Sequence, residues 1–206
     1  MTSDPKRTPD CASAAKSTPT SLTRGSAIDV RNFAATHILR NGTTILIRAV
    51  RPDDKARLRS TFGKLEKTTV YMRFFGYKNE LTDVELEQAT NVDFDQVVAL
   101  WATTGPSDAE AIIAGARYVR DPDPNSRHAE VAFTVEEDYQ GQGIARCLFA
   151  HLIDIARGKG LLRFDADVLA NNQPMLAVFA RSGLPMQRQS SEGVVHVTLC
   201  LDAGAS

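Results

Sequence analysis

A glycine-containing turn between an expected strand and an expected helix constrains the fold more than any other segment of this chain. The stretch AEVAFTV, residues 129–135, is apolar and β-branched and predicts a strand. Gly141 and Gly143 close the acidic turn that follows, and residues 143–157 carry apolar side chains at helical spacing. Glycines let a backbone approach an anion closely, and a helix N-terminus offers unpaired N–H groups to hold it. The segment therefore predicts either a phosphate-binding turn or a tight turn with a purely structural role.

Two common phosphate-binding patterns do not match this turn. The dinucleotide-binding pattern needs a third glycine, which the stretch QGQGIA at residues 140–145 lacks. It also needs an acidic residue about 20 positions later at the end of a strand, whereas Asp165 and Asp167 lie inside an expected strand. The P-loop pattern needs Gly-Lys followed by Ser or Thr, and the sequence contains no such triplet.

The patterning of the remaining chain predicts a mixed α/β (α+β) fold. Asn41-Gly42 is a turn signal, and Thr82 is expected to cap the helix that follows it. Strands are expected at 43–50, 95–103, 110–119, 129–135, 163–169 and 193–201, and helices at 51–66, 81–90, 143–157 and 172–183. One strand–helix–strand unit, residues 129–169, requires a parallel pair of strands. We therefore expect a mixed, mainly antiparallel sheet with helices on both faces.

The N-terminal segment differs in composition from the rest of the chain. Residues 1–35 are rich in Ser, Thr, Pro, Ala and charged side chains and nearly free of large apolar ones. Such a segment cannot bury enough apolar surface to offset the entropy lost on ordering. We therefore expect a disordered or loosely docked tail over residues 1–35 and one folded domain over residues 36–206.

Overall composition argues against several classes of partner. A net charge of −1 gives no electrostatic footprint for nucleic acid or an anionic membrane, and no apolar run approaches the ~20 residues of a membrane helix. The three cysteines, Cys11, Cys147 and Cys200, lack the spacing of a disulfide framework or a zinc site. We expect a cytoplasmic protein that binds no metal, with Cys147 as a core residue.

Three segments in series resemble the GNAT acyltransferase superfamily. Residues 140–145 are similar to its Q/R-x-x-G-x-G/A signature, the stretch VAFTVEEDY before them to its fourth strand, and residues 172–183 to the Asn-to-Gly segment of a later helix. The resemblance covers roughly residues 41–201. Within the superfamily, VYMRFFG at residues 70–76 and AEVAFTVEEDYQGQGIA resemble the acetyltransferase domain of bacterial Pat-type protein lysine acetyltransferases.

This resemblance implies an acetyl-CoA site and a GNAT-like domain over residues 36–206. The turn would bind the pyrophosphate through Gln140, Gly141, Gln142, Gly143, Ile144 and Ala145. The strand backbone at Phe133 and Val135 would hydrogen-bond the pantetheine arm and the thioester carbonyl, and Asn172 would reach the CoA arm. Asn172 is also well placed as a helix N-cap, and the two roles are compatible.

Glu130 is the candidate catalytic residue. From the residues alone, a glutamate in this strand is most simply a side chain facing water. The resemblance implies instead the general base, because a lysine amine with an ordinary pKa of about 10.4 must lose a proton before it attacks the thioester. We expect Val131 and Phe133 to desolvate Glu130 in part and so favour its uptake of that proton. The implied reaction is direct attack by the amine, without a covalent enzyme intermediate.

One position departs from the wider superfamily. Many members carry a tyrosine seven residues after the Asn, as general acid to the leaving thiolate, but this chain has Phe179, which cannot donate a proton. Tyr139 is a possible substitute, with packing as the alternative.

Three functions remain open from the sequence. The first is acetylation of protein lysine, the second is acetylation of a small amine, and the third is non-catalytic binding of acyl-CoA. Loops 66–82 and 120–128 are expected to select the acceptor, and the stretch YMRFFGY is expected to form a lid over it.

Overall fold

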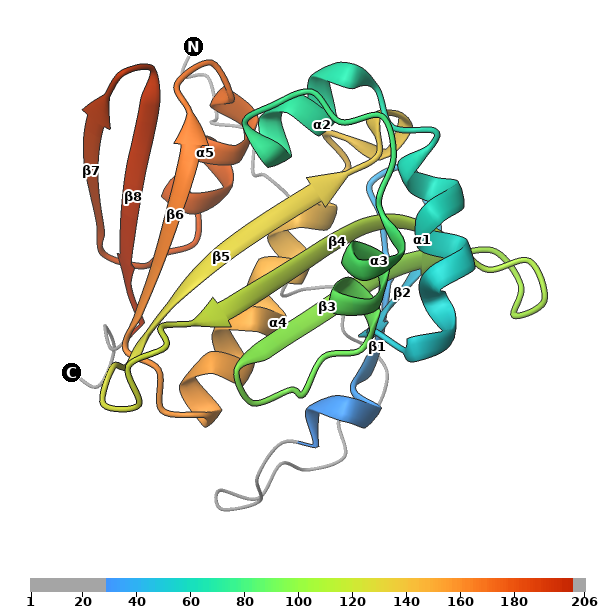
Figure 1. The fold of residues 1–206 in the computed structure, drawn as a ribbon, viewed down its shortest axis with the longest axis horizontal. Helices are drawn as coiled ribbons and strands as arrows, with labels where there is room; N and C mark the ends of the chain where they lie inside the picture. Colours follow the sequence, from blue (N-terminus) through green and yellow to red (C-terminus); the bar gives the residue numbers. More distant parts are fainter. Residues whose placement is uncertain (1–28, 202–206) are drawn as a thin grey trace, which may run out of the picture.

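The computed structural model describes residues 29–201, which form a single sheet flanked by helices (Figure 1). The sheet has the strand order β1-β2-β3-β4-β5-β6-β8-β7. Its strands are β1 (Ala34–Ile38), β2 (Thr44–Ala49), β3 (Val97–Thr104), β4 (Ala111–Arg120), β5 (His128–Val135), β6 (Arg163–Leu169), β7 (Met186–Ser191) and β8 (Val194–Cys200). The α-helices are α1 (Lys55–Phe62), α2 (Lys67–Phe74), α3 (Asp83–Thr90), α4 (Ile144–Gly158) and α5 (Gln173–Ala180). Short 3₁₀ turns occur at η2 (Val30–Asn32), η3 (Pro52–Asp54) and η4 (Glu137–Tyr139).

The strand pairing confirms the predicted mixed sheet. Every pair is antiparallel except β5 with β6. This parallel pair extends only from His128 opposite Arg163 to Glu130 opposite Asp165. Beyond it β5 and β6 diverge, as Figure 1 shows, while β5 stays paired with β4 and β6 with β8. We call this opening the fork.

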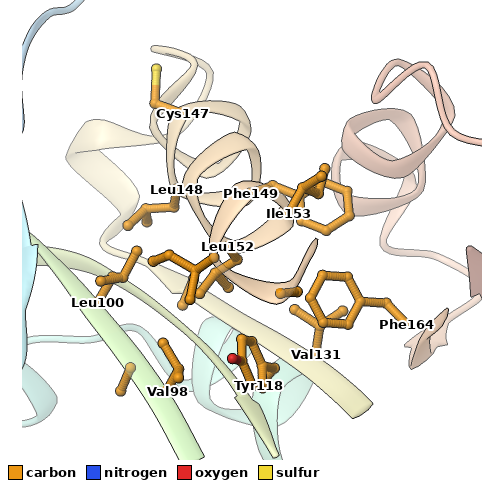
Figure 2. Packing of buried hydrophobic residues seen from close by; sticks show 14 of the residues in the cluster. Val98, Leu100, Tyr118, Val131, Cys147, Leu148, Phe149, Leu152, Ile153 and Phe164 are labelled. Atoms are coloured by element: carbon orange, nitrogen blue, oxygen red, sulfur yellow. The ribbon is translucent and has the colours of Figure 1, made fainter. Parts of the chain in front are cut away.

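Helix α4 builds the core on one face of the sheet. Its apolar side chains recur at helical spacing, so Leu148, Phe149 and Leu152 point together at the strands (Figure 2). They pack over side chains of β3, β4, β5 and β6, among them Tyr118 and Phe164 (Figure 2). Helix α5 joins the same core through Leu176 and Phe179.

Helices α1, α2 and α3 lie on the opposite face, which confirms the expectation of helices on both faces. Gly115 of β4 is needed there, because a Cβ atom at this position would lie 2.1 Å from the ring of Trp101. Thr82 caps α3 as expected, since its hydroxyl accepts from the Glu85 N–H at 3.3 Å and the Glu85 carboxylate accepts from the Thr82 N–H at 2.9 Å.

A buried charge cluster fastens the start of α1 to the sheet. Arg48, with 1% of its side chain exposed, donates to both oxygens of Asp54 at 2.7 and 2.8 Å and to Glu110 at 2.9 Å. The Arg48 hydrogen bond lowers the pKa of Glu110 to about 2. Burial opposes the charge on Arg48, but its bonds to the two carboxylates prevail and raise its pKa above the ordinary value.

The N-terminal boundary of the ordered structure differs from the expectation. Residues 29–35, which composition assigned to the tail, contain η2 and the start of β1. Val30 is 3% exposed, and the Phe33 carbonyl accepts from the Ala49 N–H at 3.0 Å. Pairing with β2 and the burial of Val30 outweigh the polar average of the segment. Residues 1–28 lie outside the described part of the chain, so the division into a tail and a domain stays a prediction.

Besides β1, one helix and one strand were not predicted. Helix α2 lies within the segment expected to be a lid and acceptor loop, residues 66–82. Strand β7 at the sheet edge is too polar and too exposed along its length to show the alternation that marks a strand.

Candidate active site

The fork exposes strand backbone that an ordinary sheet would pair. The Glu136 N–H donates to the Ile113 carbonyl on β4, and hydrogen bonding alternates along an antiparallel pair. The N–H and C=O groups of Phe133 and Val135 therefore point away from β4 and into the fork. The Val135 carbonyl accepts from the Gln140 side chain at 3.1 Å.

The glycine turn lies beside this open edge. Gly141 and Gly143 have φ angles of 70° and 94°, a conformation that side chains other than glycine rarely adopt. A Cβ atom built at either position would meet nothing within 4 Å. Gly143 is the N-cap of α4 and supplies no side-chain cap to the first-turn N–H groups of Ile144 and Ala145. The turn is therefore an open cradle for an anion at the positive end of a 15-residue helix.

A cavity of about 760 Å³ occupies the fork. It brings together most of the sequence-predicted site residues, namely Glu130, Phe133, Val135, Gln140, Gly141, Gly143, Ile144, Ala145 and Asn172. Gln142 is not among the lining residues. The Asn172 side chain accepts from the Met175 N–H at 3.2 Å, which confirms that it caps α5.

Arginines that the sequence did not single out also line this cavity. Arg40, Arg146 and Arg181 come from three separate segments of the chain. Arg40 lies near the turn, with its Nη1 atom 3.5 Å from the Gly141 carbonyl oxygen. Because they share no local motif, only the fold reveals that they gather beside the anion cradle. Their charge fits a ligand that carries several phosphates.

Helix α2 is tied to the same turn. The Glu66 N–H donates to the Glu137 carboxylate at 3.1 Å, and the Gln140 side chain lies 3.3 Å from the Thr69 hydroxyl. These contacts hold α2 over the mouth of the fork, where Phe74 also lines the cavity.

Glu130 is the last paired residue before the fork opens. Its side chain is exposed, so the expected desolvation by Val131 and Phe133 is wrong. The physical reason is strand alternation, because adjacent residues of a strand point to opposite faces. Val131 and Phe133 face the α4 core, whereas Glu130 faces the other side of the sheet.

A second cavity of about 230 Å³ lies on that other side, between the sheet and helices α1, α2 and α3. Its walls are largely apolar and include Leu58, Phe62 and Trp101. Both cavities are lined by Arg73, Phe74, Ala132, Phe133 and Thr134. The two spaces therefore meet along β5, next to Glu130.

Two arginines approach Glu130 at this meeting point. Arg117 of β4 lies diagonally opposite Glu130 on the same face, since Arg117 pairs with Ala132 and Val119 with Glu130. Burial and, after it, the charge of Arg117 lower the pKa of Arg73 to about 10, while the charge of Glu130 acts in the opposite direction.

Comparison with known proteins identifies the family. Residues 69–184, more than half of the chain, match the profile of the Acetyltransferase (GNAT) family. The chain belongs to the GNAT acetyltransferase family. The prediction of an N-acetyltransferase is thereby confirmed, and acetyltransferases are also among its similar proteins.

Two relatives are similar over most of this chain. The crystal structure of the GNAT domain of S. lividans PAT matches with a TM-score of 0.73 and 34% identity, covering 81% of this chain and 96% of that one. Acetyltransferase PA5475 of Pseudomonas aeruginosa is 29% identical over 77% of this chain and 85% of its own length.

A third relative is much longer than the matched region. Acetyltransferase Pat of Mycolicibacterium smegmatis is 36% identical over 73% of this chain, but the match spans only 44% of Pat. The fold alone is shared with YncA from Salmonella typhimurium, whose structure contains acetyl-CoA, at a TM-score of 0.62 and 18% identity.

The GNAT site lacks the tyrosine that many family members have after the Asn. Phe179 is 1% exposed, and its ring contacts those of Phe133 and Phe149 at 5.9 and 5.3 Å between centroids. It completes the core beneath the fork. Tyr139 packs partly against the core and also lines the large cavity. Its position is therefore compatible with both a packing role and a role as general acid.

Other sequence expectations concern metals, thiols and membranes. Cys147 is buried in α4, as expected of a core residue. Within residues 29–201, no group of three or more His, Cys, Asp or Glu side chains is arranged to hold a metal ion. No helix in that range is both long enough and apolar enough to cross a membrane.

Proposed function

We propose that this GNAT domain transfers the acetyl group of acetyl-CoA to the side-chain amine of a protein lysine, with Glu130 as the general base. The observation that carries the proposal is the position of Glu130, a carboxylate at the point where the cofactor-sized cavity meets the opposite face of the sheet. The likeness to the GNAT domain of PAT and to Pat supports a lysine acceptor.

The chain's own residues suit the binding of acetyl-CoA, which supplies an activated thioester. Gln140, Gly141, Gln142, Gly143, Ile144 and Ala145 form the turn and helix start that would hold the pyrophosphate, Gln142 through its backbone alone. The backbone of Phe133 and Val135 would bond the pantetheine arm and the thioester carbonyl. Asn172 would border the arm while capping α5.

The exposure of Glu130 favours a macromolecular acceptor. A base on an open face can meet a lysine carried by a second protein, whereas a small amine is better served by an enclosed pocket. Asp167, on the next strand, lines the same cavity and adds negative charge that suits an approaching ammonium group. Glu130 would take the proton, directly or through water, before the amine attacks.

A small amine is the second candidate, because the 230 Å³ cavity has apolar walls that could hold its body. Incubation of the protein and acetyl-CoA with lysine peptides and with a panel of small amines separates the two. Lysine peptides are expected to be the better acceptors. Tight binding of acetyl-CoA with no transfer to any amine would instead support the third function, a non-catalytic sensor.

The role of Glu130 is tested by Glu130→Gln, which keeps the shape but cannot accept a proton. Turnover is expected to fall by roughly 10²–10⁴-fold at neutral pH while acetyl-CoA affinity persists. The matched control is Asp165→Asn on the neighbouring strand, which removes a carboxylate that lines neither cavity.

The pH dependence of the variant sharpens this test. Part of the lost rate is expected to return as the pH rises toward the ordinary lysine pKa of about 10.4, because the amine then arrives deprotonated. Normal turnover of Glu130→Gln at pH 7 would exclude Glu130 as the base.

A further inference from the structure

Arg73 and Arg117 stand out among the charged residues around the smaller cavity. Neither guanidinium forms a hydrogen bond or an ion pair with any other residue in the range 29–201, although Arg73 lies over the Phe74 ring at 5.0 Å. Arginine presents five donors in a rigid fork and cannot shed its charge at neutral pH. Two such groups in one cavity leave many donors without a protein acceptor.

The sheet register and the cavity lining bring both groups to the reaction centre. Arg117 projects from β4 to the face that carries Glu130 and is diagonal to it. Arg73 projects from α2 and lines both cavities. Since the acetyl-CoA and acceptor sides of the fork meet at this point, an anion held by the pair would lie beside the reacting carbon.

Among the described residues, no carboxylate of the cavity wall forms an ion pair with Arg73 or Arg117. Glu130 can offset one of the two guanidinium groups. Of the two glutamates in the cavity wall, Glu85 is engaged by Lys78 at 2.6 Å, and burial raises the pKa of Glu136. Partly buried guanidinium groups without hydrogen-bonded acceptors are costly unless a ligand supplies the acceptors.

Trp101 adds a further donor to the same wall. Its ring lines the cavity, and its Nε1 atom is buried without a hydrogen-bond partner among the described residues. Three lining residues, Arg73, Arg117 and Trp101, therefore carry side-chain donors for which the described residues supply no acceptor.

We propose that Arg73 and Arg117 bind a carboxylate carried by one of the two reactants, either on the acyl group of the CoA thioester or on a residue beside the acceptor lysine. This proposal rests on the proposed function, for the acetyl-CoA site if the carboxylate is on the acyl group and for the lysine acceptor if it is on the acceptor. With a dicarboxylic acyl group the reaction is unchanged. The amine nitrogen bonds to the acyl carbon, the C–S bond breaks, the amine proton passes to the base, and CoA leaves as a thiolate that takes a proton from solvent.

The first alternative, a carboxylate on the acyl group, is tested by equilibrium binding, so this test does not depend on turnover. Calorimetry compares S-(3-carboxypropyl)-CoA with S-butyl-CoA, two thioethers of similar length that cannot transfer a group. If the carboxylate comes from the acyl group, the parent protein should bind S-(3-carboxypropyl)-CoA about tenfold more tightly than S-butyl-CoA, which is the usual effect of charge-assisted hydrogen bonds.

The acceptor arm uses acetyl-CoA with matched peptides in which the lysine is flanked by Glu or by Gln. If the carboxylate comes from the acceptor, kcat/KM is about tenfold higher for the Glu peptide. In whichever arm shows the preference, Arg73→Gln and Arg117→Gln are expected to abolish it, and Arg73→Lys to restore part of it. Arg188→Gln on β7, which lines neither cavity, is the matched control and should keep the preference.

The outcomes are separable from those of the proposed function. Absence of a carboxylate preference in both arms, or a preference that survives both Arg→Gln substitutions in folded protein, would overturn the proposal. Failure to acetylate any lysine peptide would overturn the proposed function instead. The calorimetric comparison of the two CoA thioethers would then be the remaining test of whether Arg73 and Arg117 bind a carboxylate.

Discussion

Two arginine–carboxylate clusters of this domain differ in how completely they are paired. At the start of α1, Arg48 donates to Asp54 and Glu110, and all three are largely removed from water. At the fork, Arg73 and Arg117 lie near Glu130 without a hydrogen bond between them and any other described residue. Pairing raises the pKa of Arg48, whereas burial lowers that of Arg73 to about 10.

The paired Arg48 cluster stabilises the fold, whereas the unpaired arginines at the fork are available to bind a ligand. The Arg48 cluster closes on itself and leaves no donor for an outside partner. The fork is open in three ways among the described residues, because the Phe133 backbone faces no neighbouring strand, the glycine turn has no side-chain cap, and the guanidinium groups of Arg73 and Arg117 have no acceptor. Damage to the closed cluster should therefore cost stability, and damage to the fork should cost binding or rate.

The largest stability effect is expected from Asp54→Ala. Removing the carboxylate leaves the Arg48 charge buried beside Glu110 alone, and breaking a buried pair from one side typically costs about 3–5 kcal/mol. Denaturant unfolding measures the loss. Asp53→Ala, an exposed neighbour in the same turn, should stay within about 0.5 kcal/mol of the parent. Equal stability of the two variants would show that the closed cluster contributes little to the fold.

A smaller effect, on binding, is expected from Gly143→Val. A side chain there would fill the cradle at the start of α4, so acetyl-CoA affinity should fall more than tenfold, or about 1.4 kcal/mol. Gly193→Val is the matched control, because Gly193 also has a positive φ, 81°, and open space but lies in the β7–β8 turn. The control shares the backbone strain and should keep the affinity. Unchanged affinity in calorimetry of Gly143→Val would remove the turn from the cofactor site.

The sequence predicted the elements whose side chains alternate or recur with a clear period. Strand β6 has the predicted bounds, and α4 begins one residue after the predicted start. Strand β7 could not be found this way, because it is an exposed edge whose pairing with β8 supplies its structure. Strand β1 was not predicted, and its first two residues were assigned to the tail, because a compositional average hides one buried valine.

The candidate site was predictable where its residues are contiguous and not where the fold assembles it. The glycine turn and β5 form one stretch of chain, and both line the large cavity. Arg40 and Arg181 line it too, but nothing local marks them. The surroundings of Glu130 were misjudged because sequence neighbours were taken as spatial neighbours, although a strand sends them to opposite faces.

The smallest stability effect is expected where a charge is removed from the fork. Arg73→Gln takes away a cation whose pKa is lowered by burial, so in the folded state its charged form is disfavoured relative to the unfolded chain. At pH 7 Arg73 is charged in both states, because this pH lies below both pKa values, and the unfavourable contribution is therefore fully present. Removing it should leave the free energy of unfolding within about 0.5 kcal/mol of the parent or raise it slightly. Arg48→Gln is the matched change in the closed cluster and should be strongly destabilising, since it strands Asp54 without its bidentate partner. The same denaturant unfolding tests this expectation. A loss of several kcal/mol in Arg73→Gln would mean that Arg73 stabilises the fold, as Arg48 does, and is not held available for a ligand.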